Sequence, residues 1–427
     1  MIHPAALPTL VYSDERGTIR DFPLLSMAGM THGRYSRPEL EDLIALPEGS
    51  ELFTLPDRLP VGTDPVNGEA LLFEEHPDYP GRNIQAVAAF MSPAHTSILT
   101  AAYQAKENPL LLPLFAYTAV GWHDGRFWVA GFRSDDDQRQ DYRHFKQPVI
   151  NRKTEKLLKR YRNNRLVQHL GKCCLTYHCP AARNFFLGRW EAPLPTSPVC
   201  NARCLGCISL QPSGCCQSTQ ERISFVPSAQ EVAEIALSHF NRAERPIASF
   251  GQGCEGEPLM QAELLEEAIG LIRKQTLSGT INLNSNASMP EAIGRLARSG
   301  LDSLRVSINS AQKKYYNSYY RPRGYGFSDV KDSIRVMKAA GKFVSLNYFI
   351  LPGFSDSEDE TNSFIDLLTQ TRPDYIQLRN LNIDPEWYFR SLDFPSDQPT
   401  RGIRTWLATI KREAPFLRFG YFNPFLG

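Results

Sequence analysis

The sequence predicts an α/β protein in which a partial (βα)6 barrel of the TIM type follows a mixed, mainly β N-terminal domain. From about residue 195, short apolar runs alternate with amphipathic segments, and six such runs fit within about 190 residues. Strands that alternate with helices pair in parallel through right-handed βαβ units. A full eight-fold barrel typically takes about 250 residues. Six units therefore favour an open, partial barrel.

The composition is that of an ordinary globular protein. The 427 residues include 47 Lys+Arg and 46 Asp+Glu, and 42% of them are hydrophobic. This charge balance argues against a nucleic-acid coat protein or a highly acidic chain. No apolar run reaches the ~18 residues of a membrane helix, and the N-terminus lacks the pattern of a secretory signal. We therefore expect a cytoplasmic protein with no membrane segment.

The chain divides into four predicted segments. They are an N-terminal mixed or β domain of unknown role (1–133), a charged connector with a cysteine-containing segment (134–194), the barrel (195–385) and a helix/strand extension (386–427). At this length, two or three domains are expected.

The first segment contains short apolar runs between turn-forming residues. These runs lie at 10–13, 51–56, 69–75 and 110–120. Asp124-Gly125 occupies the tip of a predicted β-hairpin, since this dipeptide favours tight hairpin turns. No motif in this segment indicates what it binds.

The connector is strongly basic over residues 152–165, which hold seven Lys and Arg residues against one acidic residue. Leu157, Leu158 and Tyr161 give this stretch a weak helical face. Two interpretations stay open. The stretch is a solvated connector helix, or it is a basic surface for a phosphate-bearing partner such as RNA.

The barrel segment contains six predicted strands and signals for helix starts between them. Its six predicted strands lie near 194–199 and at 246–250, 280–284, 303–308, 343–351 and 375–381. Ser228 with Glu231, and Ser357 with Glu360, have the spacing of N-terminal capping boxes. These pairs predict helix starts between the strands.

The cysteines are the clearest chemical signal. All nine lie between Cys173 and Cys254, and crowding of this kind in a large chain favours a metal site over a disulfide scaffold. Cys200, Cys204 and Cys207 have the spacing Cx3Cx2C directly after the first predicted strand, on the functional face of such a sheet. Four thiolates complete a [4Fe–4S] cluster, so three leave one iron open to a substrate or cofactor. A zinc site is the alternative, although zinc cysteines usually pair as CxxC.

This motif resembles the signature of the radical S-adenosylmethionine (radical SAM) enzymes, which carry Cx3Cx2C after the first strand of a partial (βα)6 barrel. The resemblance covers about residues 195–385. It implies that Cys200, Cys204 and Cys207 ligate a [4Fe–4S] cluster whose fourth iron is chelated by SAM. It also implies reductive cleavage of SAM to methionine and a 5′-deoxyadenosyl radical, which abstracts hydrogen from a substrate.

Further residues resemble the SAM contacts of this family at the strand ends. The segment Gly256-Glu257-Pro258 is similar to the Gly-Gly-Glu motif, whose carboxylate binds the amino group of SAM; a simple turn is the alternative. The implied cofactor-binding residues are Gly256, Glu257, Ser285, Asn286, Ser307, Asn309, Pro352 and Leu378. The chain departs from the family at Gly206, where an aromatic residue is usual, and Leu205 and Ile208 are the nearest replacements.

Six cysteines lie outside the motif: Cys173, Cys174, Cys179, Cys215, Cys216 and Cys254. They leave open an auxiliary metal site, with His169 and His178 as spare ligands, or a set of buried free thiols, which are common. Adjacent cysteines are awkward ligands for one metal. The auxiliary clusters of this family commonly use a C-terminal cysteine-rich extension, which is absent after Cys254. We therefore expect a single cluster.

The sequence thus predicts a radical SAM enzyme that acts on a small-molecule or peptide substrate and receives electrons from a reductase of the flavodoxin or ferredoxin type. The neutral charge favours these substrates over nucleic acid. The alternatives are an RNA-modifying radical SAM enzyme and a non-catalytic zinc or iron–sulfur binding protein. The motif does not encode the substrate, because the cofactor carries the hard chemistry.

Overall fold

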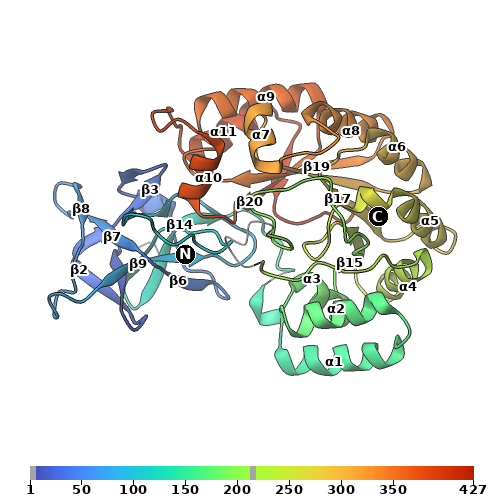
Figure 1. Ribbon diagram of the computed structural model, residues 1–427, viewed down its shortest axis with the longest axis horizontal. Helices are drawn as coiled ribbons and strands as arrows, with labels where there is room; N and C mark the ends of the chain where they lie inside the picture. The colour runs from blue at the N-terminus through green and yellow to red at the C-terminus, as the bar shows by residue number, and fades with distance from the viewer. Residues whose placement is uncertain (1–5, 140, 212–217) are drawn as a thin grey trace. The chain divides into compact units, whose positions relative to one another are not determined.

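The computed structural model describes residues 6–139, 141–211 and 218–427 (Figure 1). Contacts divide the chain into two compact units, and both are discontinuous in sequence, unlike the four predicted segments. The first comprises Met1–Asp136, Phe349–Asn362 and Leu378–Glu413. The second comprises Asp137–Tyr348, Ser363–Gln377 and Ala414–Gly427. Cys215 and Cys216 lie outside the described residues.

The N-terminal part of the first unit is antiparallel β structure. An 11-stranded sheet contains the strand path β10-β14-β13-β1-β2-β7-β12, and a 3-stranded sheet has the order β11-β3-β4. The strands are β1 (Thr9–Asp14), β2 (Ile19–Met27), β3 (Gly29–Thr31), β4 (Arg34–Ser36), β5 (Leu43–Ala45), β6 (Glu51–Leu55), β7 (Arg58–Thr63), β8 (Ala70–Leu72), β9 (Ile84–Phe90), β10 (His95–Ser97), β11 (Thr100–Ala101), β12 (Tyr103–Ala105), β13 (Val120–His123) and β14 (Arg126–Arg133). The predicted mainly β character of this region is confirmed.

The predicted hairpin joins β13 and β14. Asp124 has φ 48° and Gly125 has φ 73°, and this pair of positive values is what a two-residue type I′ turn requires. The apolar segment 110–120 is largely outside the strands. Pro113 lies within it and cannot donate to a β-ladder.

The α/β part of the chain is built on a seven-stranded sheet with the strands in sequence order, β15-β16-β17-β18-β19-β20-β21. The neighbouring pairs from β15 to β19, and the pair β20–β21, are parallel. The strands are β15 (Glu191–Pro193), β16 (Ile247–Phe250), β17 (Thr280–Ser285), β18 (Ser303–Ile308), β19 (Phe343–Ile350), β20 (Tyr375–Asn380) and β21 (Arg418–Gly420). Because β15 and β21 stand at opposite ends of this order, the sheet is an open, partial barrel, as predicted.

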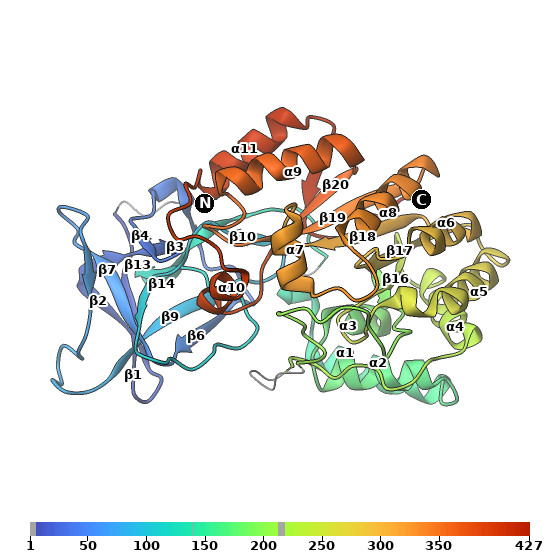
Figure 2. The ribbon, with the colours of Figure 1, turned by 45° about the horizontal axis from the view of Figure 1, so that its top comes forward.

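Helices connect these strands. They are α4 (Ala229–Phe240), α5 (Ala262–Arg273), α6 (Pro290–Ser299), α7 (Lys313–Tyr320), α8 (Phe327–Ala339), α9 (Glu358–Thr371), α10 (Pro385–Leu392) and α11 (Ile403–Glu413). In the second unit, α4 packs on α5, α5 on α6 and α6 on α8 along the outside of the sheet (Figure 2). Their apolar faces and the strands form the buried core.

Two sequence expectations differ in detail from the structure. The first barrel strand ends at Pro193, so residues 194–199 are not a strand. Pro195 and Pro198 interrupt this segment and have no N–H to donate. The short seventh strand, β21, was not among the six predicted strands.

One predicted capping box is present and the other is not formed. Ser228 Oγ accepts from Glu231 N at 3.2 Å, while Ser228 N donates to Glu231 Oε2 at 2.9 Å. Ser357 directly precedes α9, but its hydroxyl is buried and has no hydrogen-bond partner among the described residues. The position of the helix start was therefore predictable at both sites, and the capping chemistry at one.

Three helices precede the barrel: α1 (Gln147–Arg160), α2 (Arg165–Leu175) and α3 (Pro180–Leu187). The basic stretch 152–165 covers most of α1, whose Leu157 is buried, and its lysine and arginine side chains are exposed. The predicted helical face is confirmed. No helix in the described ranges combines the length and apolar character needed to cross a membrane.

Candidate active site

The Cx3Cx2C cysteines lie on the loop that follows β15. The end of α7 holds the backbone of this loop, because Arg203 N donates to Tyr320 O at 2.9 Å and Leu205 N donates to Tyr319 O at 3.0 Å. Asn201 fixes the loop from the other side, since its Oδ1 accepts from Asn286 Nδ2 at 2.8 Å. The loop is therefore anchored at both flanks.

The three thiols fit a cluster better than a single ion. Each of Cys200, Cys204 and Cys207 is partly buried. Within the described residues they do not form a group whose ligand atoms all lie within 4.8 Å of one another, and thiolates that bind different irons need a wider spacing than ligands of one ion. Burial raises the pKa of Cys200 to about 11 and that of Cys204 well above its ordinary value. Such thiols become thiolates only beside a strong positive charge, which iron supplies.

The predicted carboxylate, Glu257, lies in a buried set of hydrogen-bond donors. Its Oε1 accepts from Ser285 Oγ at 2.6 Å and from Leu259 N at 3.1 Å, and its Oε2 accepts from Asn286 N at 2.8 Å. Burial raises the pKa of Glu257 to about 7, although the hydrogen bonds act in the opposite direction. The structure thus brings Glu257, Ser285 and Asn286 together.

Gly256 joins the carboxylate loop to the segment just before Cys200. Its N–H donates to Ser197 O at 2.7 Å, and the next residue, Glu257, donates from its N–H to Val199 O at 2.9 Å. A Cβ on Gly256 would lie 2.0 Å from Val199 O. Only glycine permits this approach of the two backbones.

Sequence reasoning missed Glu255. Its buried carboxylate accepts from the N–H groups of Thr196, Ser197 and Gly251 at 2.6–3.0 Å, and from the Thr196 hydroxyl at 3.1 Å. Burial raises its pKa to about 7. Glu255 therefore ties the segment after β15 to the loop after β16, and no local spacing in the sequence signals this role.

Aromatic side chains near the cysteine loop come from α7 and the turn after it. Tyr316 and Tyr320 are buried and Tyr325 is half-buried. Burial, with a contribution from Cys204, raises the pKa of each. Leu205 is buried and Ile208 is half-buried. The signal for these tyrosines was the aromatic run at 315–325.

The remaining predicted SAM contacts are not joined to this set by described hydrogen bonds. Asn309 is buried and its Nδ2 donates to Tyr315 O at 3.2 Å, while Ser307 is half-buried on β18. Pro352 and Leu378 belong to the first compact unit. Their roles stay predictions.

A polar network fills part of the sheet interior and was not predicted as a unit. Arg305 Nη1 donates to Gln377 Oε1 at 3.4 Å, and Gln377 Nε2 donates to Asn423 Oδ1 at 2.8 Å. Asn423 Nδ2 in turn donates to Glu191 Oε1 at 2.7 Å. Buried polar groups that satisfy one another in this way fix side-chain orientation.

The first unit contains a separate cavity of about 440 Å³. His32 and Phe389 line it and stack with ring centroids 3.8 Å apart. Glu386 and Arg390 supply charged groups at its wall. This is a concave, mixed apolar and polar surface of the size that small ligands use.

Comparison with known proteins identifies the α/β part of the chain. The model of the radical SAM superfamily matches residues 194–365. The chain carries a radical SAM domain. This domain contains the cysteine loop, Glu257, Ser285 and Asn286. The family consists of enzymes whose cofactors are a [4Fe–4S] cluster and SAM, so the predicted family, enzyme class and cofactors are confirmed at the level of the domain.

The relatives of the radical SAM domain are distant. The FeMo cofactor biosynthesis protein NifB of Klebsiella pneumoniae is 24% identical over 178 residues, which are 38% of this chain and 38% of that protein. A radical SAM methyltransferase from Sphaerobacter thermophilus has a TM-score of 0.39 at 14% identity, covering 54% of this chain and 66% of its own. SuiB of Streptococcus suis, bound to the precursor peptide SuiA, has a TM-score of 0.39 at 13% identity, covering 61% and 53%. The chain thus spans well under half the length of the curated relative.

Proposed function

We propose that this protein is a radical SAM enzyme whose Cys200, Cys204 and Cys207 hold a [4Fe–4S] cluster, and that it abstracts hydrogen from a small-molecule or peptide substrate. The observation that carries the proposal is the pair of backbone hydrogen bonds between the cysteine loop and the Glu257 loop, 2.7 Å and 2.9 Å long. They support the proposal because they join the loop that carries Glu257 to the segment directly before Cys200. When bound, the cluster and SAM supply a one-electron cleavage that yields methionine and a hydrogen-abstracting 5′-deoxyadenosyl group.

The residues of the chain have distinct roles in this proposal. Glu257 binds the ammonium of SAM, because a buried carboxylate is its natural partner, and Ser285 and Asn286 hold that carboxylate in place. Arg222 donates from Nη2 to Cys207 Sγ at 3.5 Å and stabilises negative charge at that sulfur.

Four other residues complete the proposed SAM site. Ser307 and Asn309 contact the carboxylate and ribose of SAM. Pro352 provides an apolar contact to the adenine, and the backbone at Leu378 binds the adenine edge. These assignments rest on the resemblance of the strand ends to those of the family.

The test is SAM cleavage by anaerobic protein with dithionite. The wild type should yield 5′-deoxyadenosine and methionine, slowly in the absence of substrate. Replacement of Cys200, Cys204 and Cys207 together by alanine should abolish both products. Unchanged turnover in this triple variant would overturn the proposal.

The proposal also includes an electron donor and a substrate class. A reductase of the flavodoxin or ferredoxin type, in the cytoplasm, would replace dithionite in the cell. A net charge of +1 favours a small molecule or peptide over RNA. The exposed basic residues of 152–165 favour an RNA-modifying enzyme. RNA binding that weakens with salt and depends on these residues would support that alternative.

A further inference from the structure

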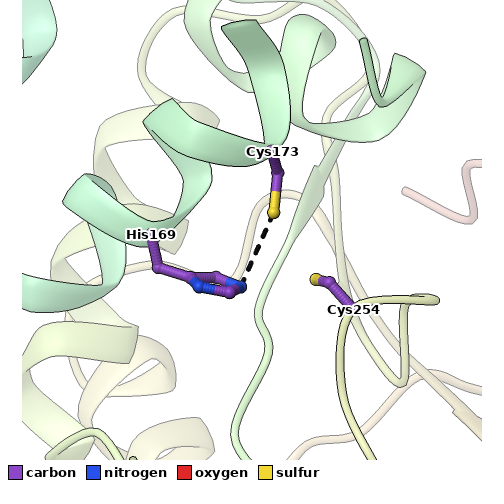
Figure 3. Close-up of side chains that lie close together, drawn as sticks. All are labelled: His169, Cys173 and Cys254. Atoms are coloured by element: carbon purple, nitrogen blue, oxygen red, sulfur yellow. Dashed lines mark hydrogen bonds between the residues drawn. The ribbon is translucent and has the colours of Figure 1, made fainter. Parts of the chain in front are cut away.

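A second group of metal-binding side chains lies outside the Cx3Cx2C loop. His169 and Cys173 are four residues apart on α2, so they project from the same face of the helix. Cys254 approaches them from the loop after β16 (Figure 3). The ligand atoms of these three residues all lie within 4.8 Å of one another, and His169 Nε2 is 3.6 Å from Cys173 Sγ. Both cysteines are buried and the histidine is half-buried.

We propose that His169, Cys173 and Cys254 bind a zinc ion. Two thiolates and an imidazole are a donor set that suits zinc, and three protein ligands leave the fourth tetrahedral position for water. With zinc–sulfur and zinc–nitrogen bonds of about 2.3 and 2.1 Å, the sulfur–nitrogen edge of a tetrahedron is about 3.6 Å. The Cys173–His169 distance matches this edge. Binding displaces the two thiol protons to solvent and requires no oxidant or reductant.

The spacing favours one ion over a second iron–sulfur cluster. In a [4Fe–4S] cluster each thiolate binds a different iron, whereas here all three ligand atoms lie within reach of a single central ion. Cys174, the neighbour of Cys173 in the chain, faces elsewhere, because its Sγ lies 3.4 Å from Thr154 Oγ1. The difficulty that adjacent cysteines pose for one metal is therefore removed, since only one of the pair belongs to the site.

The ion would fasten α2 to the loop that carries Glu255 and Glu257. The start of α2 is already fixed to α4, because Arg165 Nη2 pairs with Glu231 Oε2 at 2.7 Å. On the loop, Cys254 O accepts from Ile223 N at 2.8 Å. Cys254 is three residues before Glu257. Zinc at this position would thus act as a cross-link that orders the carboxylate loop, separately from the cluster ligands.

The experiment measures metal in the variant in which Cys200, Cys204 and Cys207 are all alanine, so that the first cluster does not interfere. This protein should hold about one zinc per chain. Adding Cys173→Ser or Cys254→Ser should reduce the zinc content at least tenfold, whereas the matched control Cys174→Ser should retain it. Cobalt added to the metal-free triple alanine variant, the parent of the serine variants, should produce thiolate-to-cobalt charge transfer and the intense visible bands of a tetrahedral site.

Several results would overturn the zinc site. They are an iron–sulfur spectrum in the parent variant, a disulfide between Cys173 and Cys254 in freshly purified protein, zinc content that survives Cys254→Ser, and cobalt spectra without thiolate ligation. The cobalt measurement leaves His169, Cys173 and Cys254 unchanged, so it decides the question even where a serine variant fails to fold. Each readout is independent of SAM cleavage and therefore of the proposed activity.

Discussion

Gly256→Ala tests the contact between the carboxylate loop and the cysteine loop. The added Cβ would lie 2.0 Å from Val199 O, and ordinary contact begins at 3.4 Å, so one backbone must move by about 1.4 Å. The bonds Gly256 N–Ser197 O and Glu257 N–Val199 O span this interface at 2.7 and 2.9 Å, and a movement of this size breaks them. Overpacking costs about 1–3 kcal/mol and two lost hydrogen bonds cost about as much again, so the expected destabilisation is on the order of 2–6 kcal/mol.

The matched control is Gly270→Ala in α5. A Cβ at Gly270 meets no atom within 4 Å, and alanine in a helix is more favourable than glycine by up to about 1 kcal/mol. Thermal unfolding should show a large loss of stability for Gly256→Ala and none for Gly270→Ala. Anaerobic calorimetry should show SAM affinity at least tenfold weaker in Gly256→Ala alone. Wild-type stability and affinity in Gly256→Ala would refute the claim that this backbone contact positions Glu257.

Three further outcomes are expected. Burial raises the pKa of Glu257 to about 7, and the ionised form binds the ammonium of SAM, so the Kd for SAM should fall about eightfold from pH 6 to pH 7.5. Calorimetry should find no such pH dependence in Glu257→Gln, whose iron content should be unchanged. A pH dependence that persists in this variant would exclude Glu257 from the SAM site. Arg222→Gln removes a positive charge 3.5 Å from Cys207 Sγ, so the cluster potential in an EPR-monitored titration should become more negative, and an unchanged potential would contradict the contact. The triple alanine variant of Cys200, Cys204 and Cys207 should be colourless, whereas a brown protein with a cluster spectrum would reveal an auxiliary cluster.

The barrel was predictable because short strands rich in apolar residues recur between amphipathic helices, the pattern of a parallel α/β sheet. Residues 280–284 and 303–308 matched β17 and β18 almost to the residue. The first strand was placed too late because an apolar segment rich in proline has the hydrophobicity of a strand without its hydrogen-bond donors. The last strand, Arg418–Gly420, is three residues long, too short for any periodicity to mark it.

The proximity of Glu257, Ser285 and Asn286 was predictable because the family motifs fall at strand ends. Glu257 follows β16, and Ser285 and Asn286 lie at the end of the neighbouring parallel strand β17. The carboxyl ends of parallel strands meet at one edge of the sheet. Glu255 was missed because three of its four donors belong to Thr196 and Ser197, which are far from it in the sequence, and no known motif marks the local donor, Gly251 N. The partnership of His169 with Cys254 was hidden for the same reason, since 85 residues separate them in the chain.

The proposed zinc site and the proposed SAM site share one short loop, and this has a thermodynamic consequence. Cys254 and Glu257 are three residues apart, so an ion that orders the loop at Cys254 lowers the entropy cost of placing Glu257 for SAM. Linkage then requires reciprocity: the factor by which zinc tightens SAM binding must equal the factor by which SAM tightens zinc binding. The hydrogen bonds from Gly256 N to Ser197 O and from Glu257 N to Val199 O extend the same coupling to the cysteine loop. A loop held at Cys254, Glu255 and Gly256 leaves the Glu257 carboxylate little freedom, and this is the preorganisation that selective binding of an ammonium group in a buried site requires.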